Sequence, residues 1–289
     1  MDSENKHSTT LADIRTRLRQ RLTPKYGERE ATAMARTILM QLKGWKHLTD
    51  LMANEDREAS EYIKGRTEEI FALLMNDVPL QYALGETSFY GLKLKVGPGV
   101  LIPRPETAEL VDIIVEENRK SDLEVLDLCT GSGAIAIALA RNLPFSRVEA
   151  IDISPAAVSI ARENAKELKT GIEIKQADIF SLNLPDDRYD IIVSNPPYVT
   201  ESEKTAMEAN VVNYEPHEAL FVSDEDPLVF YRRIGDMAKE ALKPGGKIYF
   251  EINPLFALRL RQMLETKGFK DIRIIRDIHG KDRFAAAHL

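Results

Sequence analysis

The chain has 289 residues, of which 44% are hydrophobic and 29% charged, as is typical of a globular protein and not of a disordered one. Asp and Glu outnumber Lys and Arg by 46 to 39, so the formal net charge is −7. This excess of acid argues against a broad nucleic-acid-coating surface, which needs clustered Lys and Arg to neutralise phosphates.

The first 84 residues predict a small helical bundle. Apolar residues recur at helical spacing in three segments, over residues 11–22, 34–42 and 62–74. Pro24 and Gly27 interrupt the pattern between the first two segments, and Gly44 ends the second. We interpret residues 1–84 as an N-terminal domain that is a candidate for substrate recognition, although no partner motif is evident in it.

Residues 85–105 predict a β-hairpin linker. Glycines and prolines punctuate this stretch, and Leu92, Leu94 and Val96 alternate with two lysines, which is a strand pattern. A helix is expected to open near Thr107, at the start of a second domain over residues 106–289.

From residue 123 onward, strands and helices alternate, which predicts a mostly parallel sheet covered by helices. Strand patterns occur in LEVLDL, RVEAIDI, IEIKQADI, DIIVSN and KIYFEI, and helix patterns in AIAIALARN and SPAAVSIARENAKEL. The last two strands, IRIIRDI and RFAAAHL, are joined by four residues, a link that suits only antiparallel neighbours. The prediction is therefore a Rossmann-like α/β domain whose sheet ends in an antiparallel hairpin.

Several features bear on the compartment. The single cysteine, Cys129, excludes an internal disulfide framework and favours a reducing compartment. The N-terminal sequence MDSENKHSTTLADIR is not a signal peptide, and no apolar run is long enough for a membrane span. The five scattered histidines lack the spacing of a metal site. We expect a cytoplasmic monomer with no metal and no membrane partner.

A glycine-rich turn, Asp127 to Gly133, lies between the first strand of the second domain and the following helix. Gly131 and Gly133 allow a ligand to approach the backbone, and N–H groups at a helix start attract polar ligands. The pattern G-x-G-x-x-A also fits a nicotinamide dinucleotide site. Asp152, which ends the second strand, can accept both hydroxyls of a ribose, so NAD and S-adenosylmethionine (SAM) remain equally open here.

Asp178 follows the third strand of the domain. A side chain at this position can flank an adenine, with Ile179 and Phe180 as apolar walls. An ordinary turn aspartate is the competing interpretation.

The tetrapeptide Asn195-Pro196-Pro197-Tyr198 follows the apolar strand DIIVS and is the most informative motif. Its two prolines fix the backbone, which holds Asn195 at the carboxyl edge of the sheet. The Asn195 side-chain oxygen and the Pro196 carbonyl can accept the two N–H groups of a planar amide or arylamine, and Tyr198 can stack on it. This pattern indicates methylation of an NH2 group.

With these motifs in this order, the chain resembles the HemK/PrmC family of protein-(glutamine-N5) methyltransferases, which modify peptide chain release factors. The similarity covers nearly the whole chain and is strongest over residues 79–284. It includes VLIPRPET, DLCTGSGAIAIALA, SNPPY, YEPHEAL and LKPGGKIYFEI. The resemblance implies a class I SAM-dependent methyltransferase fold, SAM as methyl donor, and the glutamine of a Gly-Gly-Gln tripeptide as acceptor.

The resemblance also implies roles for individual residues. The catalytic set is Asn195, Pro196, Pro197 and Tyr198. The SAM-binding set is Cys129, Thr130, Gly131, Ser132, Gly133, Asp152, Ile153, Asp178, Ile179 and Asn195. The acceptor-binding set adds Arg104 and Glu106 to the tetrapeptide, with an interdomain latch as the alternative role for the PRPET segment.

The chain departs from the family pattern at two positions. Cys129 stands where the family commonly has glycine, and we expect it to be an inert packing residue. Asn253 and Pro254 follow Glu-Ile where the family often has glycine, which leaves the adjoining loop open.

Three other functions remain as alternatives. A ribosomal-protein glutamine would need the same site chemistry with different docking. A nucleic-acid amino-methyltransferase also uses NPPY, but too few residues follow Tyr198 for a domain that recognises a flipped base. A dehydrogenase or a nucleotide sensor fits the glycine loop but gives NPPY no role.

Overall fold

The computed structural model describes residues 9–289, and the first eight residues, over which the sequence predicts no signal peptide, lie outside this part. The chain forms two compact units, Met1–Gly85 and Glu86–Leu289. Among residues 9–289, no helix has both the length and the apolar character that crossing a bilayer requires.

The N-terminal unit is helical, with α1 (Leu11–Lys43), α2 (Leu48–Asn54), α3 (Glu61–Met75) and α4 (Leu80–Leu84). Gly27 has φ 76° and ψ 160°, so α1 consists of two helical segments joined at a kink, which agrees with the predicted interruption. Pro24 lies inside the first segment. The short helices α2 and α4 were not predicted.

The helices of this unit bury a common apolar stripe. Ile38, Leu51 and Ile70, from three different helices, are fully buried in one cluster. Thr10 begins α1 with a capping box, in which its hydroxyl accepts from the Asp13 N–H and Asp13 accepts from the Thr10 N–H. Burial of most of the predicted stripe residues therefore accounts for the bundle, although Tyr62 and Leu73, near the ends of the third stripe, are exposed.

A hairpin of β1 (Glu86–Phe89) and β2 (Leu92–Lys95) opens the larger unit. Phe89 and Leu94 are buried in that unit's core. Lys95 donates its N–H to Asn164 Oδ1 (2.7 Å) and accepts from Asn164 Nδ2 (3.0 Å). Asn164 Nδ2 also donates to the Ser132 carbonyl at 2.9 Å, so the hairpin is fixed close to the glycine loop.

The larger unit has a seven-stranded sheet in the order β10-β11-β9-β6-β3-β4-β5. Its strands are β3 (Glu124–Leu128), β4 (Arg147–Asp152), β5 (Glu173–Gln176), β6 (Tyr189–Ser194), β9 (Leu242–Glu251), β10 (Lys270–Arg276) and β11 (Asp282–His288). Neighbours from β5 to β9 pair in parallel, and β11 pairs antiparallel with both β9 and β10. The predicted fold class, with its terminal hairpin, is confirmed.

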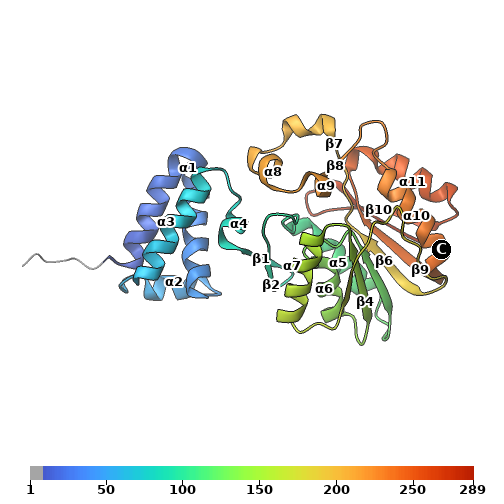
Figure 1. Ribbon diagram of the computed structural model, residues 1–289, viewed down its shortest axis with the longest axis horizontal. Helices are drawn as coiled ribbons and strands as arrows, with labels where there is room; N and C mark the ends of the chain where they lie inside the picture. Colours follow the sequence, from blue (N-terminus) through green and yellow to red (C-terminus); the bar gives the residue numbers. More distant parts are fainter. Residues whose placement is uncertain (1–8) are drawn as a thin grey trace, which may run out of the picture. The chain divides into compact units, whose positions relative to one another are not determined.

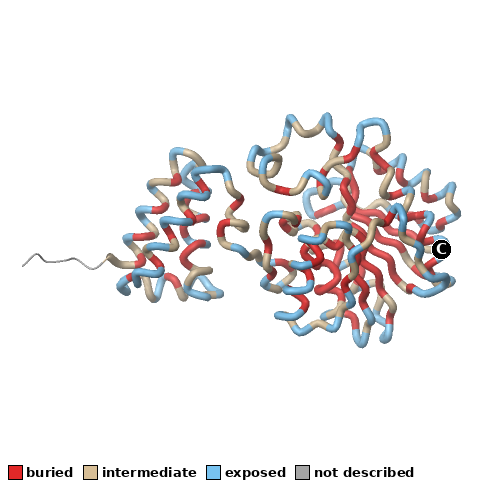
Figure 2. The backbone as a smooth tube through the Cα atoms, in the orientation of Figure 1, coloured by how far each residue is buried: buried red, intermediate tan, exposed pale blue. Residues whose placement is uncertain are grey.

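Helices cover both faces of this sheet (Figure 1). One core lies under α5 (Pro105–Glu117), α6 (Ala134–Asn142) and α7 (Pro155–Glu167), and the other under α10 (Val229–Ala241) and α11 (Ala257–Thr266). Figure 2 shows the buried strands as continuous red runs between these layers, as expected for a sheet covered on both faces. The sequence analysis did not predict α10 or α11.

An irregular segment follows NPPY at the carboxyl edge of the sheet. It contains β7 (Val199–Thr200), η1 (Glu201–Ala206), α8 (Ala209–Tyr214), α9 (His217–Leu220) and β8 (Phe221–Val222), and a further turn, η2 (Pro254–Phe256), follows β9. Val199 pairs with Phe221, which returns the YEPHEAL segment to the end of the tetrapeptide.

The chain direction fixes where a ligand can bind. The chain runs from β3 to β4 and β5 on one side, and then to β6 and β9 on the other. The carboxyl ends of β3, β4 and β6 therefore surround the crevice at which open α/β sheets bind ligands.

Candidate functional site

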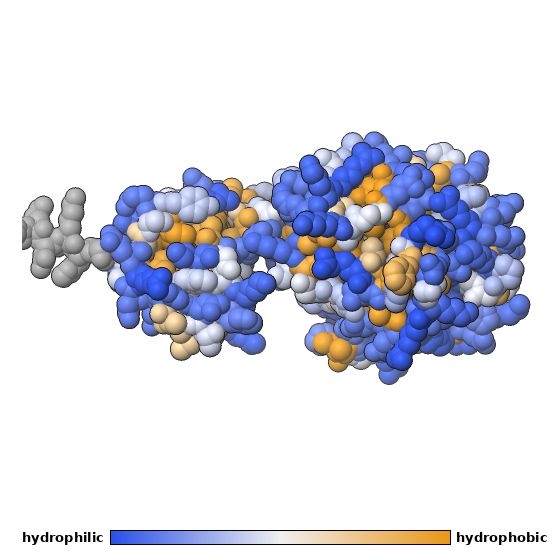
Figure 3. Space-filling model, turned by 90° about the horizontal axis from the view of Figure 1, so that it is seen from below, coloured by the Kyte–Doolittle hydropathy of each residue, from blue (hydrophilic) through white to orange (hydrophobic). Residues whose placement is uncertain are grey.

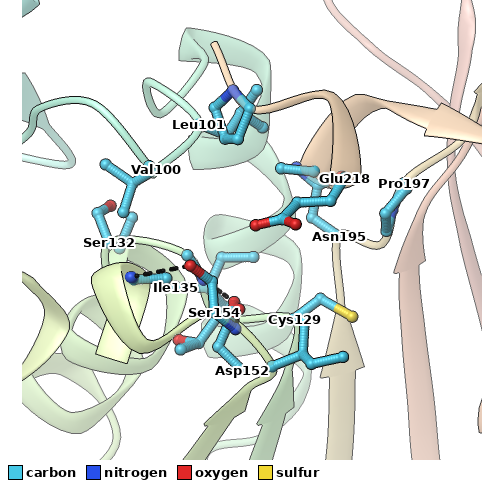
Figure 4. Close-up of a pocket in the computed structure, with 18 of the residues that line it drawn as sticks. Val100, Leu101, Cys129, Ser132, Ile135, Asp152, Ser154, Asn195, Pro197 and Glu218 are labelled. Atoms are coloured by element: carbon cyan, nitrogen blue, oxygen red, sulfur yellow. Dashed lines mark hydrogen bonds between the residues drawn. The ribbon is translucent and has the colours of Figure 1, made fainter. Parts of the chain in front are cut away.

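A cavity of about 280 Å³ opens at this crevice. Its wall includes residues that follow β3, β4, β5 and β6, together with parts of the LIPRPET and YEPHEAL segments. Figure 4 shows side chains from these segments converging on one space, with Asp152 and Glu218 pointing into it from different sides.

The loop after β3 has a left-handed backbone at alternate positions. Cys129, Gly131 and Gly133 have φ of 62°, 56° and 81°. A Cβ added to Gly131 would meet nothing within 4 Å, whereas one on Gly133 would lie 3.2 Å from Ala161 Cβ. Gly131 thus leaves open space at the cavity wall, and Gly133 permits close packing of α6 against α7.

Asp127 stabilises this loop through hydrogen bonds from the buried side. It is fully buried, and its Oδ2 accepts from Thr130 Oγ1 (2.6 Å) and from the Ala136 N–H (3.2 Å). Its Oδ1 has no partner among the described residues. Burial raises the pKa of Asp127 to about 7, because the two donors offset only part of the desolvation of the carboxylate.

Asp152 lines the cavity and joins two neighbouring loops. Its Oδ2 accepts from the Gly131 N–H at 2.8 Å and its Oδ1 from the Ser154 N–H at 2.9 Å, and dashed lines in Figure 4 mark hydrogen bonds of this kind. Each carboxylate oxygen can accept a second bond, so capacity remains for ligand hydroxyls. Burial raises the pKa of Asp152, and the charge of Glu218 adds to this effect.

An apolar wall lies beside Asp178. Ile153 and Phe180 line the cavity although 55% and 47% of their surfaces are exposed, and Ile179 behind them is buried. Phe180 packs edge-on against Phe230, with ring centroids 5.3 Å apart. Figure 3 shows that apolar patches interrupt the mostly hydrophilic surface on one face of the molecule. Exposed apolar walls in a cavity suit a flat ligand ring.

Asn195 lines the opposite side of the cavity and is partly exposed. Its side-chain amide makes no hydrogen bond to any residue of the described range 9–289, so its oxygen is free to accept. Pro197 also lines the cavity, whereas Pro196 and Tyr198 do not. Tyr198 turns instead toward β9, where its hydroxyl donates to Glu251 Oε1 at 3.0 Å.

The PRPET segment contributes to the cavity mouth. Arg104 and Thr107 line the cavity, whereas Glu106 does not. Arg104 Nη2 lies 2.8 Å from Glu215 Oε1, and the buried Glu215 also accepts from the Ile102 N–H at 3.0 Å. This ion pair therefore joins the LIPRPET loop to the YEPHEAL segment within the larger unit.

The structure brings most of the predicted ligand-binding residues to one cavity. Those that line it are Arg104, Cys129, Thr130, Gly131, Ser132, Asp152, Ile153, Asp178, Ile179, Asn195 and Pro197. Glu106, Gly133, Pro196 and Tyr198 lie outside its wall. Gly133 instead serves the packing of α6, as its close approach to α7 indicates.

The sequence analysis missed several wall residues, notably Glu218. This side chain is exposed and points into the cavity near Asp152 (Figure 4). It lies in YEPHEAL, a segment that carries part of the family resemblance but in which no residue was singled out. Gly99 to Leu101 also line the wall. The signals in the sequence were the glycine and proline density around them and the VLIPRPET motif, which begins at Val100.

Cys129 packs at the edge of the core that lies under α10. Burial raises the pKa of its thiol far above the usual range, and the charge of Asp152 acts in the same direction. The thiol is therefore protonated and weakly nucleophilic at neutral pH, which supports the packing role.

Residues 107–220 match a family model described as the methyltransferase small domain. A release factor glutamine methyltransferase from Bacteroides thetaiotaomicron is 47% identical over 272 residues, which cover 94% of this chain and 97% of the relative. One from Flavobacterium psychrophilum is 40% identical over 277 residues, with the same coverage of both chains.

Among solved structures, a methyltransferase from Pyrococcus furiosus superposes with a TM-score of 0.51 at 15% identity. The match covers 79% of this chain and 98% of that one. This likeness concerns the fold alone.

The backbone at residue 129 gives a first expected outcome. Because φ is left-handed there, Cys129→Gly is expected to be more stable than Cys129→Ala by about 1 kcal/mol. Denaturation in urea measures the difference. Ala140→Gly in α6 is the control, since glycine inside a helix should destabilise by about 1 kcal/mol. An alanine variant as stable as the glycine variant would disprove strain at Cys129.

The buried Asp127 gives a second expected outcome. Its folded pKa of about 7 lies above the unfolded value of about 3.9. The favourable contribution of Asp127 to the free energy of unfolding is therefore fully present below pH 4, and it is lost as the pH rises toward 7. The side chain introduced by Asp127→Asn cannot ionise. The stability of this variant relative to the wild type is therefore expected to increase from pH 4 to pH 7 and to stay constant above pH 7. Unfolding free energies at pH 4, 6 and 8 test this, and parallel pH curves would refute it.

Proposed function

The chain belongs to the family of release factor glutamine methyltransferases, and we propose that Asn195 presents the side-chain amide of a release-factor glutamine to the methyl group of SAM. The enzyme transfers that methyl group to the amide nitrogen, N5. The proposed acceptor is the glutamine of the Gly-Gly-Gln tripeptide. The observation that carries the assignment of Asn195 is its free amide at the cavity wall, at the end of β6.

The charges of the cavity wall fit SAM. Three carboxylates line it, those of Asp152, Asp178 and Glu218. The one guanidinium on the described wall, that of Arg104, is already paired with the buried Glu215. SAM carries a sulfonium cation and supplies an activated methyl group when bound. A wall with excess negative charge favours such a ligand.

The wall residues suggest how SAM would be held. Thr130 to Ser132 would take the methionine end, where Gly131 leaves open space beside the backbone. Asp152 would accept the ribose hydroxyls with its remaining lone pairs. Asp178, Ile153 and Ile179 would flank the adenine, beside the exposed ring of Phe180.

An amide nitrogen is a poor nucleophile because its lone pair is delocalised. Two acceptors aimed at its two N–H groups orient the nitrogen and stabilise the positive charge that develops there. In our proposal these acceptors are the Asn195 side-chain oxygen and the Pro196 carbonyl. Asn195 is held in place by the two prolines that follow it, since they restrict the backbone.

The remaining parts of the proposal concern the protein as a whole. We assign substrate recognition to the N-terminal helices, and methyl transfer to the larger unit, with residues 85–105 as the linking hairpin. Release factors act on ribosomes, so the enzyme is expected to work in the cytoplasm. We propose that it acts as a monomer.

Incubation with methyl-labelled SAM tests the function. A release factor should become labelled, and its Gln→Ala variant in the Gly-Gly-Gln tripeptide should not. Labelling of ribosomal proteins in preference to the release factor, or of duplex DNA, would assign a different acceptor. Equal labelling of the glutamine and alanine factors would overturn the proposal.

Asn195 and Asp152 should separate turnover from binding. Asn195→Ala is expected to lower kcat by about 100- to 1,000-fold, as loss of one positioned transition-state hydrogen bond does, with SAM affinity nearly unchanged. Asp152→Ala should instead weaken SAM binding by about 10- to 100-fold. Calorimetry and single-turnover rates measure the two effects. Loss of SAM binding in Asn195→Ala, with normal turnover of the bound complex, would contradict its role.

Glu218 should distinguish the cationic donor from its neutral product. Glu218→Gln is expected to weaken SAM binding by about threefold to tenfold, through loss of a partly screened charge, and to leave S-adenosylhomocysteine binding unchanged. Glu225→Gln, an exposed change outside the cavity wall, is the control. Equal loss for both ligands would show that Glu218 acts through shape and not through charge.

A further inference from the structure

The end of β9 and the chain just beyond it hold Tyr198 at two points. Glu251, which is 1% exposed, accepts from the Tyr198 hydroxyl at 3.0 Å. Asn253, which is 4% exposed, donates from Nδ2 to the Tyr198 carbonyl at 3.1 Å. Thus both the side chain and the main chain of the last residue of the tetrapeptide are tied to one short stretch of chain.

Each of these two side chains also fixes a second segment. Glu251 Oε2 accepts from Thr107 Oγ1 at 2.6 Å, and Thr107 lines the cavity at the start of α5. Asn253 Nδ2 donates to Glu203 Oε2 at 2.8 Å, and the same oxygen accepts from the Thr200 N–H at 2.9 Å. The chain on both sides of Tyr198 is therefore bound to the same framework.

Because Glu251 is buried, breaking its hydrogen bond with Tyr198 costs a large free energy. Removing a donor from a buried carboxylate leaves desolvated charge without a partner, which costs more than the hydrogen bond itself provides. Burial raises the pKa of Glu251, while its two hydroxyl donors and Arg283 favour the charged form. Burial and the charge of Glu251 also raise the pKa of Tyr198, so its hydroxyl remains a donor.

We propose that Glu251 and Asn253 are positioning residues that act through Tyr198. They line no part of the cavity and so do not touch the donor. By holding both ends of Tyr198 they fix the turn on which Asn195 is presented. Asn253 stands where the resemblance leads one to expect glycine, so this chain has a side-chain contact there that glycine cannot make. The proposal rests on the proposed function, because the pose it protects is that of the acceptor amide.

A double-mutant cycle tests the Glu251 contact. Glu251→Gln and Tyr198→Phe are each expected to lower kcat for the release factor by about 10-fold or more, with SAM affinity within twofold of wild type. Both changes act on the same contact, because glutamine replaces the charged acceptor with a weaker neutral one and phenylalanine removes the donor. The double variant should therefore be little slower than the slower single variant. Additive losses, or wild-type kcat in a folded Glu251→Gln, would overturn the proposal.

The chain offers a matched control. Glu117 Oε2 accepts from the Tyr249 hydroxyl at 3.0 Å, which is the same type of pair, and neither residue lines the cavity. Glu117→Gln should reduce stability to denaturant without changing kcat. Loss of kcat in this variant equal to that of Glu251→Gln would show that the effect of Glu251 is only structural.

The Asn253 contact is tested separately. Asn253→Asp replaces the donor with an oxygen facing the Tyr198 carbonyl and Glu203, and should lower kcat more than Asn253→Gly does. Hydrogen exchange over residues 195–200, measured with SAM bound, should become faster in the Asp variant and in Glu251→Gln. Exchange at the wild-type rate in both would overturn the proposal.

The exchange measurement also separates two failures. A wild-type protein that methylates no release factor would refute the proposed function, whereas unchanged exchange in the variants would refute the positioning role alone.

Discussion

The site depends on a single buried carboxylate, that of Asp127. The N-cap residue of helix α6 is a glycine, Gly133, which has no side chain to accept from the first free N–H groups of the helix. Asp127, at the end of the preceding strand, accepts from the Ala136 N–H in its place, and from the Thr130 hydroxyl with the same oxygen. These two hydrogen bonds fix the left-handed turn between β3 and α6. The Gly131 N–H in this turn donates to Asp152.

The same arrangement recurs along the carboxyl edge of the sheet. Asp152, at the end of β4, holds the loop that follows β3, and Glu251, at the end of β9, holds the loop that follows β6. The loops after β3 and β6 are therefore each fixed by a side chain from a neighbouring strand. Because the sheet is covered by helices on both faces, these strands are rigid supports, which is what a site needs to keep its geometry.

The predictable parts of the site are those in which the functional residues themselves determine the local backbone conformation. The glycine loop and Asn-Pro-Pro-Tyr are legible because glycine and proline restrict or permit particular backbone angles at their own positions. The terminal hairpin follows from a four-residue link. The left-handed φ of Cys129 could not be predicted, since cysteine gives no local signal for it.

The contacts that could not be predicted join residues far apart in the sequence. Glu251 lies 53 residues from Tyr198, and Glu215 lies 111 residues from Arg104. Such pairs depend on which strands become neighbours, and residue type alone does not determine strand order. The role of Tyr198 illustrates the consequence, because stacking was inferred from its ring, whereas its hydroxyl contact with β9 decides where that ring lies.

The charge of the cavity wall distinguishes between SAM and a nicotinamide dinucleotide, which fit the glycine loop equally well. A nicotinamide dinucleotide brings a pyrophosphate to this loop, and a nucleic-acid acceptor brings phosphates to the cavity mouth. Either would meet Glu218 in addition to the ribose-binding Asp152, with no unpaired cation among the described residues of the wall, since Arg104 is paired with Glu215. A sulfonium donor and a neutral amide acceptor meet no such repulsion. The local charge thus favours the same chemistry as the family relationship, on independent physical grounds.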